Sequence, residues 1–389
     1  MQGSSINKKL IRITTVPMAL RYLLPGQMWF MSENGFDVLM ISADGKEIRD
    51  VIKNEQCPHI IVPMTRKITP FQDLSCLLQL IRIFRREKPD IVHTHTPKAG
   101  LLGMLAARYC GVKIRIHTVA GLPMMVEKGF KYWLLKQVEK LTYKAANHVW
   151  PNSNSLLQFI LALHLAPPGK LNLIAKGSTN GIDLNRFDVA VLEEKKIQDC
   201  KTAITYSDQN KYLLCTSRLV VDKGITLLIN VFMALQKTHP SVRLILVGDF
   251  ENELNPLPEA TLKEIENNNA IIHISWTPDV EYYMHIADHF IFPSLREGFP
   301  NVLLQAGAME LPIVCSRIPG NIDIVAHNET GLIFADRDEK QMLNMIEYAL
   351  ANPVAVQKMA KRLRQIIEAD YRRENIWQNM LAAYKSLVN

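Results

Sequence analysis

The chain has 389 residues, 48% of them hydrophobic, and a formal net charge of +7. A chain of this length exceeds what one hydrophobic core usually serves, so the composition predicts two α/β domains rather than one. The six cysteines form no C-x-x-C pair and no His/Cys cluster with zinc-ligand spacing, which argues against a zinc framework and is typical of a protein from a reducing cytoplasm.

Short apolar runs that favour β-strands alternate with longer amphipathic segments, which indicates βαβ units and parallel sheets. The first half is predicted to contain strands at Ile11–Val16, Phe36–Ile41, Ile60–Pro63, Asp90–Thr96, Lys113–Val119 and His148–Asn152. The second half is predicted to contain strands at Tyr212–Thr216, Val242–Val247, Ile271–Trp276, His289–Pro293, Ile313–Cys315 and Gly331–Phe334. The expected fold class is α/β, with two doubly wound, Rossmann-like domains and a binding cleft between them.

The boundary between the two domains is expected after Gly177 and Gly181, whose glycines suit a chain reversal. The segment that follows is charged and lacks clear periodicity. We therefore predict an N-terminal domain of residues 1–187, a linker of residues 188–210 and a C-terminal domain of residues 211–365. Residues 366–389 are expected to form a helix that packs back toward the N-terminal domain.

The charge is unevenly distributed between the halves. Residues 1–187 hold 25 Lys and Arg against 12 Asp and Glu, whereas residues 188–389 hold 20 against 26. A basic half is typical of proteins that meet nucleic acid, an anionic membrane or a phosphorylated substrate, although scattered solvating lysines give the same count. The basic half has no aromatic-interleaved arginine cluster, which argues against nucleic acid. No stretch approaches the ~18 apolar residues of a membrane span, and no signal peptide is expected.

One helix of the basic half is predicted from Phe130 to Ala145, with Leu134, Val138 and Leu141 on its apolar face. Lysines at positions 136, 140 and 144 form an adjacent row that flanks Trp133. A tryptophan beside a row of cations suits a membrane interface, where the ring lies at headgroup level. An ordinary solvated surface helix is the alternative.

The strongest motif follows the predicted strand that ends at Pro293. It reads S-L-R-E-G-F-P-N-V-L-L-Q-A, so that Glu297, a glycine turn and a proline precede a helix. The free N–H groups at the start of such a helix point a positive dipole end at an anion, and a phosphate fits that place. Glu297 and Gln305 would lie at different depths and hold sugar hydroxyls. A plain strand-turn-helix connection is the alternative.

A second motif, T-S-R-L-V-V-D-K-G, also lies between a predicted strand and a helix. Its cations, Arg218 and Lys223, are five residues apart and suit a clamp on a diphosphate. A departing nucleoside diphosphate gains negative charge as its bond to the sugar breaks, so preorganised cations stabilise the transition state more than the ground state. A structural salt bridge made by Arg218 is the alternative.

A third motif, V-H-T-H-T-P-K-A-G, ends a predicted strand in the first half. His93 and His95 are two residues apart and hence on one face, and with Lys98 they could orient an acceptor hydroxyl or a diphosphate. Ordinary polar residues at the end of a strand are the alternative. The D-x-D sequence at Asp336 to Asp338 imitates a metal site, but helix capping explains it more simply, and neither a metal nor a cofactor is expected.

Taken together, Arg218, Lys223 and the segment from Glu297 to Gln305 resemble the donor-site motifs of glycosyltransferase family 4, which are retaining enzymes of the GT-B fold. The resemblance covers nearly the whole chain. The segments 92–100 and 177–187 resemble the branch that builds bacterial capsular polysaccharide and O-antigen repeat units on a polyprenyl diphosphate lipid. Enzymes of that branch work at the cytoplasmic face of the membrane, which implies a cytoplasmic, peripherally membrane-associated protein.

The resemblance implies roles for individual residues. Arg218 and Lys223 would bind the donor diphosphate and Glu297 the transferred sugar. The backbone of the following segment would hold sugar and phosphate, with two further residues near the base: Gly298, Phe299, Pro300, Asn301, Val302, Leu303, and Trp276 and Thr277. Gln305 stands where the family has a ribose-binding glutamate; the amide keeps hydrogen-bonding capacity but loses the charge. Ala120 replaces a common family histidine, so that histidine's role does not carry over.

The function implied is a retaining, metal-independent transfer of a hexosyl or N-acetylhexosaminyl unit from a UDP-sugar to a lipid diphosphate-linked saccharide. Attack from the face of the leaving group, with a donor phosphate oxygen accepting the proton, requires no enzymic nucleophile. Three alternatives stay open at this point. They are a GT-B-fold epimerase or phosphorylase, a sugar-nucleotide-binding protein without catalysis, and a basic nucleic-acid-binding protein.

Overall fold

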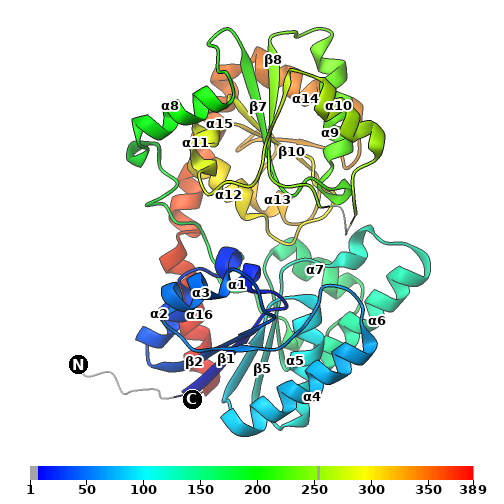
Figure 1. The fold of residues 1–389 in the computed structure, drawn as a ribbon, viewed down its shortest axis with the longest axis vertical. Helices are drawn as coiled ribbons and strands as arrows, with labels where there is room; N and C mark the ends of the chain where they lie inside the picture. Colours follow the sequence, from blue (N-terminus) through cyan, green and yellow to red (C-terminus); the bar gives the residue numbers. More distant parts are fainter. Residues whose placement is uncertain (1–7, 252–254, 389) are drawn as a thin grey trace. The chain divides into compact units, whose positions relative to one another are not determined.

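The computed structural model describes residues 8–251 and 255–388, which divide into two compact units (Figure 1). The first unit contains the chain up to Asn180 together with the segment from Arg373, and the second runs from Gly181 to Arg372. Each unit has a six-stranded parallel sheet with helices on both faces, as the alternating pattern predicted.

The first unit has the strand order β3-β2-β1-β4-β5-β6, with every pairing parallel. Its strands are β1 (Lys8–Ile13), β2 (Phe36–Ser42), β3 (His59–Ile61), β4 (Ile91–Thr94), β5 (Ile114–Val119) and β6 (His148–Pro151). Its helices are α1 (Pro17–Leu23), α2 (Gln27–Glu33), α3 (Ile48–Glu55), α4 (Pro70–Glu87), α5 (Pro97–Tyr109), α6 (Gly129–Ala145), α7 (Asn154–Ala162) and α16 (Arg373–Val388), with short 3₁₀ helices at Pro123–Val126 and Pro168–Lys170.

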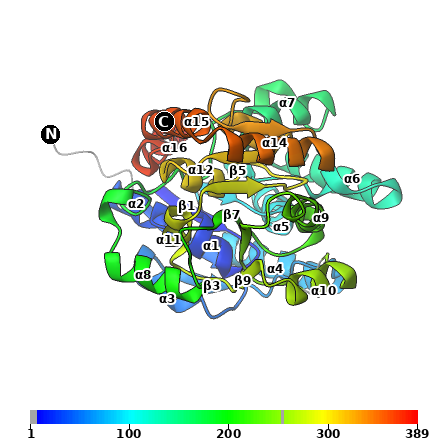
Figure 2. The same ribbon diagram turned by 90° about the horizontal axis from the view of Figure 1, so that it is seen from above.

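Two apolar clusters cover the faces of the first sheet. One joins the sheet to α4, α5, α6 and α7, and the other joins it to α1, α2, α3 and α16. Helix α16 lies beside α2, as Figures 1 and 2 both show. The C-terminal helix of the chain therefore helps to build the core of the first unit.

The second unit has the strand order β12-β11-β10-β7-β8-β9, again with parallel pairings. Its strands are β7 (Lys211–Thr216), β8 (Val242–Val247), β9 (Ile271–Ile274), β10 (His289–Phe292), β11 (Ile313–Ser316) and β12 (Leu332–Phe334). Its helices are α8 (Glu194–Ala203), α9 (Ile225–Gln236), α10 (Glu259–Asn267), α11 (Val280–Ile286), α12 (Asn301–Ala308), α13 (Asn321–Ile324), α14 (Glu339–Ala351) and α15 (Pro353–Asp370), with short 3₁₀ helices at Val189–Val191 and η4 (Val221–Lys223).

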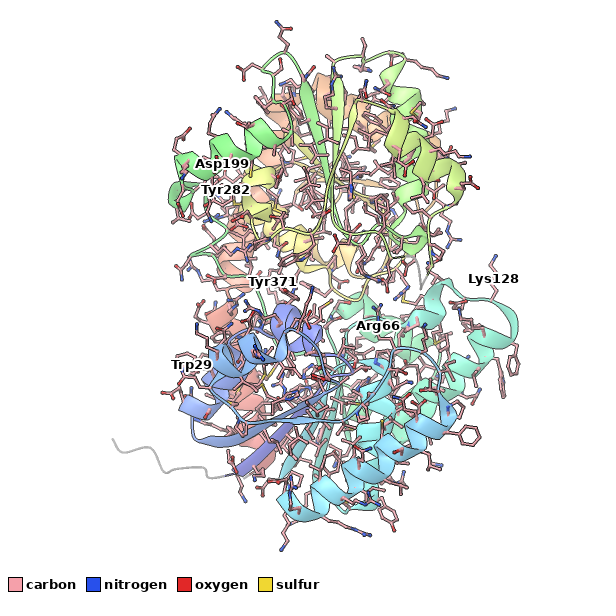
Figure 3. The ribbon with its side chains drawn as sticks, in the orientation of Figure 1. Trp29, Arg66, Lys128, Asp199, Tyr282 and Tyr371 are labelled. Atoms are coloured by element: carbon pink, nitrogen blue, oxygen red, sulfur yellow. The ribbon has the colours of Figure 1, made fainter. Side chains whose placement is uncertain are left out.

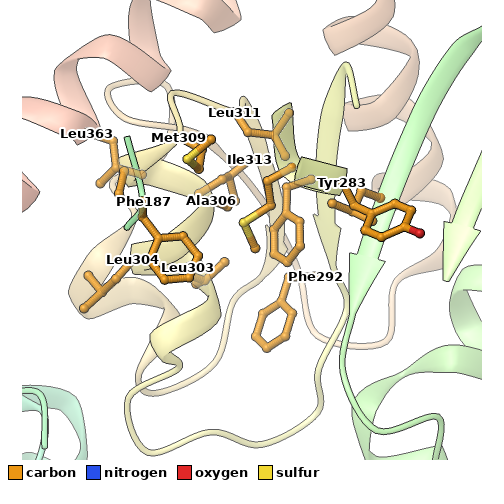
Figure 4. Packing of buried hydrophobic residues seen from close by; sticks show 14 of the residues in the cluster. Phe187, Tyr283, Phe292, Leu303, Leu304, Ala306, Met309, Leu311, Ile313 and Leu363 are labelled. Atoms are coloured by element: carbon orange, nitrogen blue, oxygen red, sulfur yellow. The ribbon is translucent and has the colours of Figure 1, made fainter. Parts of the chain in front are cut away.

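Helices α8, α11, α12 and α15 pack on one face of the second sheet, and α9, α10 and α14 pack on the other. Figure 4 shows how α12 takes part in the first of these clusters. Leu303 and Leu304 lie among side chains that include Phe187, Phe292 and Leu363. This packing fixes α12 against the sheet, and it thereby fixes the loop that precedes the helix.

Several boundaries differ from those predicted. The chain passes from the first unit to the second after Asn180, and the expected linker of residues 188–210 contains α8. Ile197 and Cys200 of that helix are buried in the core of the second unit, so the segment is part of that unit rather than a linker. All twelve predicted strands are present. Strand β1 ends at Ile13 instead of Val16, because Val16 precedes α1 and Pro17 begins it.

The buried side of α6 also differs from the predicted apolar face. Phe130 and Leu141 are exposed, whereas Glu139, Thr142 and Tyr143 are buried. Helical spacing alone did not predict which side of the helix is buried. Tyr143 packs in the cluster that faces the sheet, and its polar neighbours on the same side of the helix are buried as well. The exposed side of the helix therefore carries two aromatic residues, Phe130 and Trp133, where the sequence predicted only Trp133.

A buried polar network joins α16 to the first sheet. Arg12 of β1 is completely buried, and one of its Nη atoms donates a hydrogen bond to Tyr384 Oη at 2.8 Å while the other donates to the Gln27 side chain. Asn180 Oδ1 accepts from Gln27 Nε2 at 3.0 Å and from Trp377 Nε1 at 2.6 Å. Burial lowers the pKa of Arg12 and raises the pKa of Tyr384 to about 12.

Candidate active site

Two loops of the second unit meet at the carboxyl edge of its sheet. One follows β7 and leads through η4 to α9, and the other follows β10 and leads to α12. The Leu295 N–H donates to the Asp222 carbonyl at 3.0 Å. Gly224 has a φ of +71°, and a Cβ atom there would lie 2.0 Å from the Pro293 carbonyl oxygen. This close approach requires glycine, and it brings the two predicted donor motifs together.

Two ion pairs connect these loops. In one the first loop provides the cation, and in the other it provides the anion. Lys223 Nζ lies 2.5 Å from Glu297 Oε1, and Arg296 Nη2 lies 2.6 Å from Asp222 Oδ2. The side chains of Lys223 and Glu297 are 18% and 13% exposed, so their attraction is screened less than that of a surface pair. Each loop thus contributes one acid and one base at consecutive positions.

The Glu297 carboxylate is also held from a third loop. Ser294 Oγ donates to Glu297 Oε1 at 2.7 Å, and Ser316 Oγ donates to the Ser294 carbonyl at 2.5 Å. Asn321 Nδ2 in turn donates to the Ser316 carbonyl at 2.9 Å. A chain of hydrogen bonds therefore orients Glu297 from the end of β11 and the start of α13.

Backbone contact reinforces this support. Gly320 has a φ of +87°, and a Cβ atom there would lie 2.7 Å from the Gly298 carbonyl oxygen. A larger residue at position 320 would push the segment after Glu297 out of place. Sequence patterns did not reveal the contributions of Ser316, Gly320 and Asn321, because these residues lie outside both motifs and form no pattern of their own.

The Asp222–Arg296 pair was missed as well, although a signal for it exists. Asp222 directly precedes Lys223, and Arg296 directly precedes Glu297. Two adjacent charges in the order acid-base on one loop and base-acid on the other are complementary. That complementarity could have suggested that the loops lie side by side.

The N-terminus of α12 offers backbone donors. The helix begins at Asn301 after Pro300, and no side chain caps it. The Leu303 N–H donates to the Pro300 carbonyl at 3.0 Å, whereas none of the hydrogen bonds among the described residues uses the N–H of Asn301 or Val302. Two of the three expected N–H groups are therefore available to an anion, at the positive end of the helix dipole.

Side chains of the same segment have different surroundings. Phe299 is 6% exposed and packs against Tyr371 with ring centroids 5.4 Å apart, and Leu303 is completely buried. These two side chains belong to the core and are closed to a ligand. Gln305 lies one turn inside α12 and is half-buried, with no hydrogen-bond partner for its amide among the described residues.

Arg218 lies on the same sheet edge, after β7. Its guanidinium is ion-paired with Glu251, and its side chain is 40% exposed. Gly248 permits the close approach of the neighbouring loop, because a Cβ atom there would lie 1.9 Å from the Ser217 carbonyl oxygen. Both predicted cations, Arg218 and Lys223, are thus bound to carboxylates in this structure.

Trp276 and Thr277 follow β9 at this edge. The Trp276 N–H donates to Asp249 Oδ1 at 2.9 Å, and the Trp276 side chain is 52% exposed. The Leu219 N–H donates to the Asp249 carbonyl at 2.9 Å, so Asp249 connects the loop of Trp276 to that of Arg218. The Thr277 hydroxyl accepts from the Asp279 N–H at 3.1 Å.

The three predicted residues of the first unit have distinct environments. His93 is fully buried, and its ring nitrogens lie 2.5 Å from Tyr384 Oη and 2.7 Å from Thr118 Oγ1. Contact between His93 and a ligand would require those bonds to break. Burial lowers its pKa well below the usual value, with His95 and Arg12 contributing.

Lys98 lies at the start of α5, and its ammonium group is bound within the protein. It lies 2.7 Å from Asp73 Oδ1 and 3.2 Å from the hydroxyls of Thr65 and Thr69. The side chain is 13% exposed. His95 is the member of the trio whose ring nitrogens have no hydrogen-bond partner among the described residues.

The predicted capping role of the D-x-D sequence is confirmed, because Asp338 Oδ1 accepts from the Gln341 N–H at 2.8 Å at the start of α14. Among residues 8–251 and 255–388, no group of three or more His, Cys, Asp or Glu side chains is placed to hold a metal ion. Within the same residues, no helix is long and apolar enough to cross a membrane.

Comparison with known proteins agrees with this arrangement. Residues 31–177 match the glycosyl transferase 4-like domain, and residues 199–370 match the glycosyl transferases group 1 family. Together with two Rossmann-like units and the loops around Glu297, these matches define a glycosyltransferase of the GT-B fold. The chain belongs to glycosyltransferase family 4, in the branch that builds bacterial capsular polysaccharide.

Among individual relatives, the capsular polysaccharide biosynthesis glycosyltransferase CapM of Staphylococcus aureus is 33% identical over 386 residues, which is 98% of each chain. The Escherichia coli UDP-Gal:alpha-D-GlcNAc-diphosphoundecaprenol alpha-1,3-galactosyltransferase is 26% identical and covers 80% of this chain and 79% of its own. The fold is that of Anabaena HepE in complex with UDP-glucose, with a TM-score of 0.80, 16% identity, and coverage of 97% of this chain and 99% of that one.

Proposed function

We propose that this glycosyltransferase moves a hexosyl or N-acetylhexosaminyl unit from a UDP-sugar to a saccharide carried on a polyprenyl diphosphate. The observation that carries the proposal is the position of Lys223 and Glu297 between two loops that α12 and Gly224 hold in place. The names of two relatives support the lipid-linked acceptor. One is the E. coli galactosyltransferase, and the other is the N,N'-diacetylbacillosaminyl-diphospho-undecaprenol alpha-1,3-N-acetylgalactosaminyltransferase of Campylobacter jejuni, which is 23% identical.

In this proposal the donor diphosphate binds beside Arg218 and Lys223, where the carboxylates of Glu251 and Glu297 now lie. Arg218 exchanges Glu251 for phosphate oxygens, and Lys223 contacts both the phosphate and Glu297. The N–H groups of Asn301 and Val302 add two neutral donors at the helix N-terminus. These groups stabilise the charge that develops on the leaving diphosphate, which is the role a divalent cation fills in other transferases.

Glu297 contacts hydroxyls of the transferred sugar, and the hydrogen-bond chain from Ser294 and Ser316 keeps it in place. Trp276 offers an exposed ring face for the base, and Gln305 offers an amide for the ribose hydroxyls. We assign no enzymic nucleophile. Retention follows from attack on the leaving-group face, with a donor phosphate oxygen accepting the proton of the acceptor hydroxyl.

We further propose that the first unit associates with an anionic membrane through α6. Phe130 and Trp133 are 75% and 53% exposed, and their rings stack with centroids 5.6 Å apart. Lys128 precedes the helix and points away from the body of the unit (Figure 3). Lys136 lies over the Tyr132 ring at 5.9 Å. Aromatic rings beside cations match the headgroup region of a bilayer.

The test is a transfer assay with purified protein, a panel of radiolabelled UDP-sugars and a lipid extract from bacterial membranes. Transfer predicts label in the lipid fraction and release of UDP that depends on the acceptor. Acceptor-independent product would favour an epimerase or phosphorylase. Tight UDP binding without transfer to any acceptor would favour a non-catalytic binding protein. The anomeric configuration of the product, determined by NMR, tests retention.

A further inference from the structure

The amino edge of the first sheet, where its strands begin, carries several cations beside the end of α6. Arg108 lies in the last turn of α5, which packs against α6 (Figure 1). Arg115 is the second residue of β5, and His148 is the first residue of β6. Lys170 ends the 3₁₀ helix Pro168–Lys170. These residues lie at the edge opposite to the one where the predicted acceptor residues lie.

Three of these cations bind the last carbonyl groups of α6. Lys170 Nζ donates to three of them at 2.6, 3.0 and 3.4 Å, the longest contact being to the Lys144 carbonyl. Arg108 Nη1 donates to the same Lys144 oxygen at 3.2 Å. Arg115 Nε donates to the next carbonyl, that of Ala145, at 2.8 Å. One oxygen atom therefore joins Lys170 to Arg108, and its neighbour on the helix holds Arg115. We call these three side chains the cationic cluster.

Capping of the helix explains only part of this arrangement. A helix C-terminus carries about half of one negative elementary charge, which cations nearby stabilise. The cationic cluster brings three full positive charges to it. The carbonyl groups use one Nη atom of Arg108 and the Nε and Nη1 atoms of Arg115. Among residues 8–251 and 255–388, Nη2 of neither guanidinium forms a hydrogen bond, so that donors and positive charge remain available.

The surrounding sequence provides little negative charge to balance the cationic cluster. Residues 91–182 contain eleven Lys and Arg but only two Asp and Glu. Of these two, Glu127 is ion-paired with Lys131 at 2.6 Å, and burial raises the pKa of Glu139 to about 7. Within the part of the chain that the structure describes, no carboxylate is ion-paired with a member of the cluster. The cluster therefore lacks a counter-ion from the protein itself.

The members of the cluster repel one another and their neighbour His148. Burial lowers the pKa of Lys170, and the charges of Arg115 and Arg108 lower it further. Burial and the charge of Arg108 lower the pKa of Arg115. Burial and the charges of Arg115 and Lys170 lower the pKa of His148. An anion bound at this place would relieve the repulsion and accept hydrogen bonds from the guanidinium groups.

We propose that Arg108, Arg115, Lys170 and His148 form a binding site for a phosphate group at the amino edge of the first sheet. A carboxylate has two oxygen atoms and one charge, whereas a phosphate has more acceptors and up to two charges, which matches two guanidinium groups and an excess of cations. The phosphate can belong to a soluble ligand or to a phospholipid headgroup. The second source rests on the proposed association of α6 with a membrane; the site itself does not.

The experiment follows the Cε1–H resonance of His148 by NMR in the full chain, while inorganic phosphate replaces chloride at constant ionic strength. We expect phosphate to raise the pKa of His148, because a nearby anion favours the imidazolium. Arg108→Gln should weaken phosphate binding about tenfold, since it removes a hydrogen bond between two charged groups. Arg82→Gln is the matched control, because Arg82 is an exposed arginine of α4. His148→Asn assigns the resonance.

The comparison of phosphate with chloride in the wild type requires no variant. A His148 resonance that titrates identically in both salts would overturn the site, as would equal phosphate affinity of folded Arg108→Gln and Arg82→Gln proteins. Thermal unfolding verifies that the variants are folded.

Sedimentation with phosphatidylglycerol vesicles distinguishes the two sources of the phosphate. Weaker sedimentation of Arg108→Gln than of Arg82→Gln assigns the site to a lipid headgroup, and equal sedimentation together with the NMR response assigns it to a soluble ligand. Neither measurement depends on sugar transfer. Failure of the phosphate site therefore leaves the proposed function standing, and an inactive protein whose His148 responds to phosphate leaves the site standing.

Discussion

Lys223 Nζ and Glu297 Oε1 lie 2.5 Å apart although 74 residues separate them in the chain. The pair joins a loop that ends at Gly224 to a loop that ends at α12, and both side chains are mostly buried. An anionic ligand at this position meets a lysine whose carboxylate partner remains within the site. In the proposed function the pair orients the cation toward the donor phosphate.

Replacement of this lysine tests its part in catalysis. We expect Lys223→Ala to lower kcat about 100-fold or more, because the lysine stabilises charge that develops as UDP departs. The measurement is the initial rate of acceptor-dependent UDP release. Lys263→Ala, which removes a surface lysine of the same unit that is ion-paired with Glu259, should leave the rate unchanged. Normal turnover of a folded Lys223→Ala protein would refute the role.

Glu251 provides a test of the second cation. It is ion-paired with Arg218 in this structure, so a donor diphosphate must displace it. We expect Glu251→Ala to bind UDP more tightly, by roughly two- to tenfold, which is the range of a partly exposed ion pair. Calorimetric titration with UDP measures the change, and Glu259→Ala is the control. An unchanged or weaker affinity would mean that Arg218 does not receive the diphosphate.

Gly224 tests whether the loops must touch. An alanine there would place its Cβ 2.0 Å from the Pro293 carbonyl oxygen and would adopt a φ of +71°. We expect Gly224→Ala to lower the free energy of unfolding by about 1–3 kcal/mol or more and to abolish transfer. Gly169→Ala is the matched control, because no atom lies within 4 Å of the position that its added methyl group would take. Urea unfolding of both variants separates backbone strain from a general effect of added methyl groups.

The buried histidines of the first unit predict a pH dependence of stability. Burial lowers the pKa of His93 and His95 well below the usual value and that of His117 to about 4. Below pH ~6.5 the unfolded chain therefore binds protons that the folded chain does not, so the free energy of unfolding falls with falling pH by up to about 1.4 kcal/mol per pH unit for each histidine.

His117→Asn isolates one of these contributions. The asparagine amide retains a hydrogen-bonding group near Nδ1, which lies 2.8 Å from Thr94 Oγ1. Urea unfolding between pH 7 and pH 5 measures how the free energy of unfolding depends on pH. We expect the slope for His117→Asn to be smaller, by an amount that approaches the contribution of one proton, about 1.4 kcal/mol per pH unit, near pH 5. Because other histidines titrate too, the difference between the two proteins is the quantity of interest. Equal slopes would show that His117 is protonated alike in both states.

Exposed aromatic residues on α6 predict the membrane interaction. We expect Phe130→Ser/Trp133→Ser to reduce sedimentation with vesicles that contain anionic lipid, since interfacial binding scales with buried apolar area. Val354→Ser, at a side chain that is 84% exposed in the second unit, is the control. Equal sedimentation of the double variant and the wild type would remove α6 from the interface.

Much of the fold followed from the sequence, because parallel strands buried on both faces are continuous apolar runs. Both donor loops were recognisable for a similar reason: each follows such a run and carries charges and a glycine. The supports of Glu297 were not recognisable. Ser316 acts by donating a hydrogen bond to a carbonyl, and Gly320 acts by adopting a positive φ. Neither feature can be recognised from the neighbouring residues in the sequence.

The histidines show the same division. A spacing of two predicted that His93 and His95 share a face, and their rings do lie 4.2 Å apart. What distinguishes them is Tyr384, which is 291 residues away from His93 and forms a hydrogen bond with the His93 ring and not with the His95 ring. No local pattern could show which of the two remained unbonded, because the answer depends on where the last helix packs.

The position of α16 has a consequence for biosynthesis. Arg12, buried in the first strand, contacts Tyr384 only after the 372 residues that separate them in the chain have been synthesised. The second unit, which is continuous in sequence, is complete before the first one is. Until α16 is synthesised, the part of the first sheet's apolar face that α16 covers stays exposed, and chaperones have a defined surface to protect during that interval.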